Sequence, residues 1–135
     1  MAIVSTKGVY GLTAILILAK EKDLLQIKEI AAKGDIPQNY LEQILVTLKK
    51  SGLVQSIRGA NGGYKLLKDA NEITVFEVLS SLECCLAHTD GKTKTDLLQH
   101  FWEDIQKKIE KIFMLSITEL EEFLDKKSDN LVYYI

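Results

Sequence analysis

The residues best suited to bind an anionic partner lie in one glycine-rich segment, 58–63. The guanidinium of Arg58 matches the geometry of a phosphate group, and the glycines let the backbone approach a ligand closely. Strand-like runs at 53–57 and 64–68 flank the segment, so it is predicted to form the tip of a β-hairpin. The candidate contact residues of this tip are Arg58, Gly59, Asn61 and Gly62.

Two predicted helices precede the hairpin. The first spans 26–33, with apolar residues at helical spacing, and the second spans about 38–51. Gly34 can supply a left-handed cap between them, and Pro37 can begin the second helix. Helix, turn, longer helix and hairpin together predict a winged helix-turn-helix, which can place its second helix in a major groove. The alternative is a small fold in which these elements bind nothing.

The charge of the chain is divided unevenly along its length. The 135 residues have a net charge of −2, which is unusual for a protein that binds nucleic acid. Residues 1–68, however, contain ten basic and five acidic side chains, whereas residues 69–135 contain seven basic and fourteen acidic ones. Such asymmetry is expected where only one face meets phosphate. Ordinary solvated surface charge explains each lysine singly but explains the segregation less well.

Three further features limit the class of protein. The apolar run 9–19 is too short to span a bilayer and lacks a signal-peptide cleavage pattern, so we expect a cytoplasmic protein. The adjacent pair Cys84 and Cys85 does not form an extracellular disulfide framework. No nucleophile–base pair or phosphate-cradling motif is present, so we expect no enzymatic activity.

The first predicted helix, 7–20, is apolar on more than one face, so one side can cover the helix-turn-helix and the other needs a second partner. Lys7 and Tyr10 near its start could reach a DNA backbone; they could equally be an exposed lysine and a tyrosine at the core edge. A further helix, 75–83, is predicted after Thr74 as its cap.

A long helix is predicted over 95–114, with apolar residues spaced 4, 3, 4 and 3 apart as in a coiled-coil seam. These residues are Leu98, Trp102, Ile105, Ile109 and Ile112. A small domain cannot bury this seam alone, so we expect a homodimer that pairs the long and first helices and binds a near-palindromic DNA site. A short helix beginning near 116, a polar linker at 125–130 and an apolar tail complete the chain.

The predicted fold is therefore mainly α with a small β-hairpin wing. Residues 1–83 form a winged helix-turn-helix DNA-binding domain, and 84–94 form a loop with Cys84 and Cys85. Residues 95–135 form the dimerisation helix, the short helix and the tail.

Four motifs together resemble one family. They are Ser5–Leu12, Tyr40–Gln43, Gly52–Val54 and Arg58–Tyr64. Over nearly the whole chain they resemble the Rrf-two family of bacterial winged-helix regulators. The resemblance implies a dimer that represses, and sometimes activates, transcription.

By position in the family motif, the DNA-facing residues of the second helix are Asn39, Tyr40, Glu42 and Gln43. Gln43 can bind adenine bidentately, and Glu42 can accept a hydrogen bond from a cytosine amine. Because Glu42 would repel a phosphate, it would sharpen selectivity rather than add affinity. The alternative for both residues is a solvated helix face.

The cysteines depart from the pattern of those family members that bind an iron–sulfur cluster. These members have three spaced cysteines, whereas this chain has the adjacent Cys84 and Cys85. Asp96 aligns with the third cysteine, and Gln99 aligns with a histidine of the family's iron–sulfur regulator. Adjacent thiolates are poor joint ligands, so we expect no cofactor. The side chains that could still complete an unusual cluster or zinc site are His88, Asp96 and His100. The two cysteines could instead sense redox conditions through their thiols, or they could be ordinary loop thiols.

The closer likeness is to the cluster-free cysteine-metabolism repressors of the family, which share the aromatic tail ending in Tyr-Ile. Cysteine synthase captures C-terminal isoleucines of partner proteins, so the resemblance implies that Tyr134 and Ile135 dock into that enzyme. The tail could instead pack on its own fold. We expect a DNA-binding transcriptional repressor; the alternatives are an iron–sulfur or thiol redox regulator and a dimeric adaptor that does not bind DNA.

Overall fold

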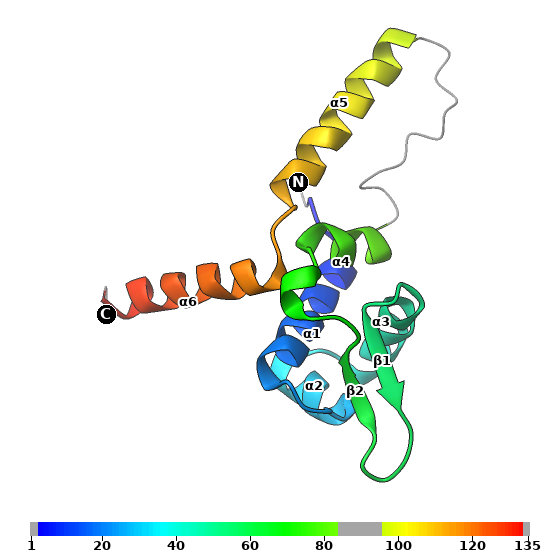
Figure 1. Ribbon diagram of the computed structural model, residues 1–135, viewed down its shortest axis with the longest axis vertical. Helices are drawn as coiled ribbons and strands as arrows, with labels where there is room; N and C mark the ends of the chain where they lie inside the picture. The colour runs from blue at the N-terminus through cyan, green and yellow to red at the C-terminus, as the bar shows by residue number, and fades with distance from the viewer. Residues whose placement is uncertain (1–2, 84–95, 134–135) are drawn as a thin grey trace.

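The computed structural model describes residues 3–83 and 96–133 (Figure 1). It is mainly helical with one β-hairpin, as the sequence predicted. The elements are α1 Thr6–Glu21, α2 Ile27–Gly34, α3 Gln38–Lys50, β1 Val54–Ile57, β2 Gly63–Leu66, the 3-10 turn η1 Ala70–Glu72, α4 Val75–Leu82, α5 Asp96–Ile112 and α6 Ile117–Tyr133. Within the described ranges, no helix is long and apolar enough to cross a membrane.

Helix α1 lies at the centre of the fold, where it packs against α2, α3, α4, β2 and α6 (Figure 1). Ser5 caps it, because its Oγ accepts a hydrogen bond from the Gly8 N–H at 3.2 Å. The backbone N–H and hydroxyl of Ser5 donate to Glu83 Oε1 at 2.8 and 2.6 Å, which ties the start of α1 to the end of α4. We expected a partner chain to cover one side of α1. Elements of the same chain instead surround much of this helix.

Helices α2 and α3 form the predicted helix-turn-helix. Glu29 accepts a hydrogen bond from the Gln26 N–H at 3.1 Å and so caps the start of α2. The turn differs from the prediction in one respect: Asp35, with φ of 51°, takes the left-handed position, and Gly34 is the last residue of α2. Aspartate tolerates this conformation better than most residues. Pro37 then precedes α3 as predicted.

The wing is an antiparallel pair in which Val54 lies opposite Leu66 and Ile57 opposite Gly63. Leu25, from the segment before α2, adds a single isolated rung beside β2, because its N–H and C=O exchange hydrogen bonds with Tyr64 at 3.0 and 2.8 Å. Gly63 allows this approach, since a Cβ there would lie 2.5 Å from the Leu25 carbonyl oxygen. The hairpin is thus attached to the helix-turn-helix through its backbone.

The segment that connects α5 to α6 is part of the core. Its backbone bonds to the start of α4: the Val75 N–H donates to the Leu115 carbonyl and the Phe76 N–H to the Phe113 carbonyl, both at 2.9 Å. Ile117 is fully buried. From this anchor α5 and α6 extend away from the winged-helix body in different directions (Figure 1).

The prediction of a short last helix followed by a polar linker was wrong. Helix α6 continues through residues 125–130 to Tyr133. Ser116 and Glu119 cap its start reciprocally, with hydrogen bonds of 3.1 and 3.2 Å. Because residues 117–133 contain no glycine or proline, the polar residues do not break the helix, and those at 125–129 are exposed.

The remaining predicted elements lie within about two residues of those observed. Helix α4 ends at Leu82 and begins with the predicted cap Thr74, whose Oγ1 accepts a hydrogen bond from the Glu77 N–H at 3.1 Å. Helix α5 is slightly shorter than the predicted 95–114. The loop 84–94 and the residues Tyr134 and Ile135 lie outside the described residues.

Replacing Ile117 by Ala is expected to lower the free energy of unfolding by about 2–5 kcal/mol, because it leaves a cavity in the core. Met114→Ala is the matched control, since Met114 lies three residues earlier and is 60% exposed; we expect less than about 0.5 kcal/mol there. Urea denaturation followed by circular dichroism measures both. Equal losses would contradict the assignment of this connection to the core.

Candidate nucleic-acid interface

The candidate reading residues of α3 share its solvent face. Asn39, Glu42 and Gln43 are exposed, and their spacing of three and one places them on one side of the helix. The opposite side buries Leu41, Ile44, Leu45 and Leu48 completely. Within the described ranges, the structure contains no side-chain hydrogen bond from Asn39, Glu42 or Gln43. Their amide and carboxylate groups are therefore available to the edges of bases.

Tyr40 and Tyr10 are brought together. Their ring centroids are 5.6 Å apart with the rings at 78°, an edge-to-face pair that joins α3 to α1. Both rings are half-buried and pack against the core. Lys7 is also half-buried and lies about one turn before Tyr10 on α1. The pair thus has a packing role in addition to the DNA contact that the sequence predicted for each residue.

The wing tip presents Arg58 and Asn61 to solvent. The turn depends on Gly59, whose φ of 119° favours glycine, and it closes through a hydrogen bond of 3.0 Å from the Gly62 N–H to the Gly59 carbonyl. Arg58 forms no ion pair with another described side chain. Its guanidinium is therefore free to take a phosphate.

The orientation of the wing relative to α3 is fixed by a side-chain contact as well as by packing. Strand β1 packs on α3, and Lys49 Nζ donates to Ser56 Oγ at 2.8 Å. This hydrogen bond connects the last turn of the candidate reading helix to the hairpin. We therefore expect α3 and the wing tip to approach a ligand as one rigid unit.

A basic groove of about 550 Å³ lies between the start of α2 and the hairpin. Its cationic lining residues are Lys28, Lys49 and Arg58. Lys28 occupies the first turn of α2, where the helix dipole disfavours a cation and favours an anion. A bound phosphate would offset that cost and also meet the N–H groups at the helix start.

Sequence reasoning missed Lys28 as a candidate site residue. The position of Lys28 in the sequence does not indicate a site, because Lys28 comes close to Arg58 only when the hairpin folds back beside α2. The weak signal available was a lysine in the first turn of a short helix.

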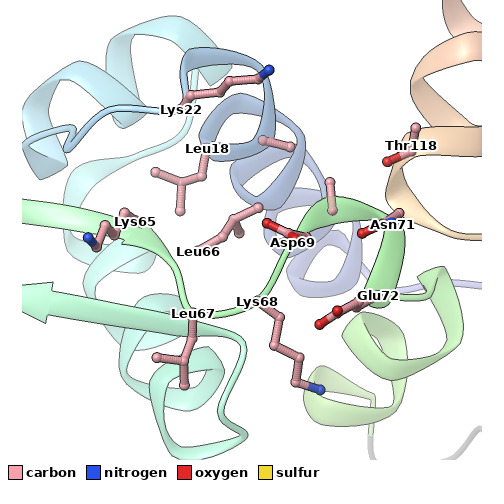
Figure 2. A pocket seen from close by; sticks show the side chains of 12 residues that line it. Leu18, Lys22, Lys65, Leu66, Leu67, Lys68, Asp69, Asn71, Glu72 and Thr118 are labelled. Carbon is pink, nitrogen blue, oxygen red and sulfur yellow. The ribbon is translucent and has the colours of Figure 1, made fainter.

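A second hollow, of about 800 Å³, lies between the end of α1, the end of β2, η1 and the start of α6 (Figure 2). Figure 2 shows that its lysines, Lys22, Lys65 and Lys68, point away from one another. Lys68 also forms an ion pair with Glu77 at 3.3 Å. The hollow therefore has no convergent set of charges for a ligand.

The candidate metal or redox residues are not brought together in the described part of the chain. Cys84, Cys85 and His88 lie outside it, and no group of three potential metal ligands occurs within it. Gln99 lies on α5, as does His100, which is 3.7 Å from Glu103. The tail residues Tyr134 and Ile135 are likewise outside the described ranges.

Comparison with known proteins gives concordant matches. The model of the Rrf2 family, described as an iron-dependent transcriptional regulator, matches residues 4–126. The HTH-type transcriptional regulator CymR of Bacillus subtilis strain 168 is 30% identical over 136 residues, covering 98% of this chain and 99% of CymR.

Solved structures agree with this match. The structure of CymR, the global cysteine regulator of B. subtilis, is 31% identical and has a TM-score of 0.76, covering 91% of this chain and 98% of its own. The structure of T. potens IscR has the same TM-score of 0.76 at 31% identity, covering 93% of this chain and 90% of its own.

Replacing Lys28 by Gln is expected to weaken binding to duplex DNA and to reduce the slope of log K against log salt by about 0.9, the contribution of one neutralised phosphate. Fluorescence anisotropy titrations over a series of salt concentrations measure both. Lys126→Gln, on the exposed surface of α6, is the matched control and should leave the slope unchanged. If the Lys28 variant keeps the full slope, Lys28 does not contact a phosphate.

Proposed function

The chain belongs to the Rrf2 family and is a DNA-binding transcriptional regulator; we propose that it acts as a homodimeric repressor that inserts α3 into the major groove of its operator. Its relatives are transcriptional regulators, so it is a regulator and not an enzyme. The observation on which the proposal rests is the exposed polar face of α3 beside a basic wing. Gln43 would bind adenine and Glu42 would accept from a cytosine amine, with Asn39 beside them.

Phosphate contacts would hold this helix in place. Arg58 at the wing tip and Lys28, which line the same basic groove, would contact phosphates beside the bases that α3 reads. Five of the fourteen acidic side chains of residues 69–135 lie on α6, which has two basic ones and extends away from the body (Figure 1). The net charge of −2 is therefore compatible with binding DNA.

The homodimer is supported by the apolar side of α5. In the single chain, Leu98 is 43% and Trp102 41% exposed, while Ile112 is 70% exposed. Ile105 and Ile109 are half-buried on the same seam. Side chains of this kind repeat at coiled-coil spacing, and a second copy of α5 would cover them. A two-fold axis through the pair would present two copies of α3 to a near-palindromic site.

The signal that the regulator answers is open to two interpretations. CymR is a cysteine regulator, and the likeness to it favours control of cysteine or sulfur metabolism. Docking of Tyr134 and Ile135 into cysteine synthase would then couple DNA binding by the regulator to the sulfur status of the cell. The alternative is an iron–sulfur or thiol redox regulator that uses Cys84 and Cys85. Both proposals concern residues outside the described ranges.

Two substitutions are expected to distinguish phosphate contacts, which position the protein on DNA, from base contacts, which recognise its sequence. Arg58→Ala should weaken binding to every duplex alike, since a phosphate has the same charge next to any base. Gln43→Ala should cost about 1–3 kcal/mol for the preferred base at one position and leave binding to unrelated duplexes unchanged. Competition gel shifts with single-base operator variants measure both effects. If neither variant differs from the wild type, Arg58 does not contact a phosphate and Gln43 does not read a base.

Leu98→Glu is expected to convert the dimer to a monomer, because it places a charge in the apolar seam of α5. Sedimentation velocity at micromolar concentration measures the mass. Leu67→Glu, at a residue of similar exposure (51%) after β2, is the matched control and should remain dimeric. A wild-type chain that sediments as a monomer would rule out the proposed interface.

A further inference from the structure

Val46 is an exposed aliphatic side chain on a helix that otherwise buries its aliphatic residues. Within α3, all of which the structure describes, Leu41, Ile44, Leu45 and Leu48 are 0% exposed. Val46 is 50% exposed. A β-branched residue at an exposed helical site lowers helix propensity and gains little from packing, so the stability of the fold does not explain it.

The position of Val46 places it among the candidate reading residues. It follows Gln43 by three residues, Glu42 by four and Asn39 by seven, and these spacings put all four side chains on one face of the helix. At 1.5 Å per residue, Val46 lies about 4.5 Å further along the axis of α3 than Gln43. This distance is close to one base-pair rise of about 3.4 Å.

Two polar neighbours of Val46 are engaged within the chain. The Thr47 hydroxyl donates to the Gln43 carbonyl at 3.1 Å, and Lys49 Nζ donates to Ser56 Oγ at 2.8 Å. At position 46 of α3, therefore, an aliphatic side chain faces outward, between Gln43 and the exposed Lys50 one turn further along the helix. A protein partner would need a broader apolar patch than one valine flanked by Glu42 and Gln43.

We propose that Val46 is a specificity-determining residue that packs against the C5-methyl group of a thymine in the major groove. This inference rests on the proposed insertion of α3 into that groove. The thymine methyl is the apolar feature that the major-groove edges of the bases present, and apolar side chains read it by contact. The thymine should lie within two base pairs of the adenine that Gln43 binds.

The test removes the methyl group from either side of the contact. The preferred operator is first selected from random duplexes with the wild-type chain, and each of its thymines is then replaced singly by uracil, which lacks the C5-methyl. At one position, uracil should weaken wild-type binding about fourfold, the effect expected for burying one methyl-sized group. Val46→Ala should weaken binding to the thymine operator by a similar factor. This variant should bind the thymine and uracil forms of that position with equal affinity.

The Val46→Ala variant should fold, since alanine has the higher helix propensity and the site is exposed. Leu67→Ala is the matched control at 51% exposure and should retain the full response to uracil. The wild type could bind its operator selectively while no thymine shows a methyl effect that is lost in Val46→Ala. That result would overturn this inference and leave the proposed function standing. Failure of the wild type to select any duplex would overturn both.

Discussion

The burial of one side of α3 determines what its other side can do. Four aliphatic side chains of this helix are completely buried, and each contributes about 1.5–3 kcal/mol relative to an exposed position. A rotation of α3 about its axis would expose them, so the core sets the direction of Asn39, Glu42 and Gln43. The Tyr10–Tyr40 pair and the Lys49–Ser56 hydrogen bond then fix α3 relative to α1 and to the wing. Reading face and wing are thus positioned by the core and not by a ligand.

The distribution of charge is the second constraint. A chain with a net charge of −2 binds a polyanion only if its acidic groups stay away from the contact. Here the basic half forms the helix-turn-helix and the wing, while many of the acidic residues lie on α6, which the anchor at Ile117 directs away from the body (Figure 1). The same arrangement leaves the apolar side of α5 exposed, which supports pairing between two chains.

Local signals in the sequence predicted much of the fold. The cap at Thr74, the glycine-rich turn after β1 and the apolar spacing of the helices act within a few residues, so they can be recognised without the structure. The resemblance to the Rrf2 family, carried by the motifs around Tyr40 and Arg58, is confirmed.

Features that depend on distant residues could not be predicted. The rung between Leu25 and Tyr64 and the proximity of Lys28 to the wing arise from segments about thirty or more residues apart. The exposure of Val46, by contrast, follows from the spacing of α3 alone, because position 46 lies off the stripe formed by Leu41, Ile44, Leu45 and Leu48. The extent of α6 was underestimated because a polar composition was interpreted as a linker, although no residue there ends a helix.

The most direct test of this account is an NMR titration of the ¹⁵N-labelled chain with its selected operator. We predict that the amide resonances that shift belong to the start of α2, to α3 and to the hairpin tip, and that those of α6 stay unchanged. Shifts centred on α6, or no shifts at all, would contradict the assignment of the reading surface to α3 and the wing.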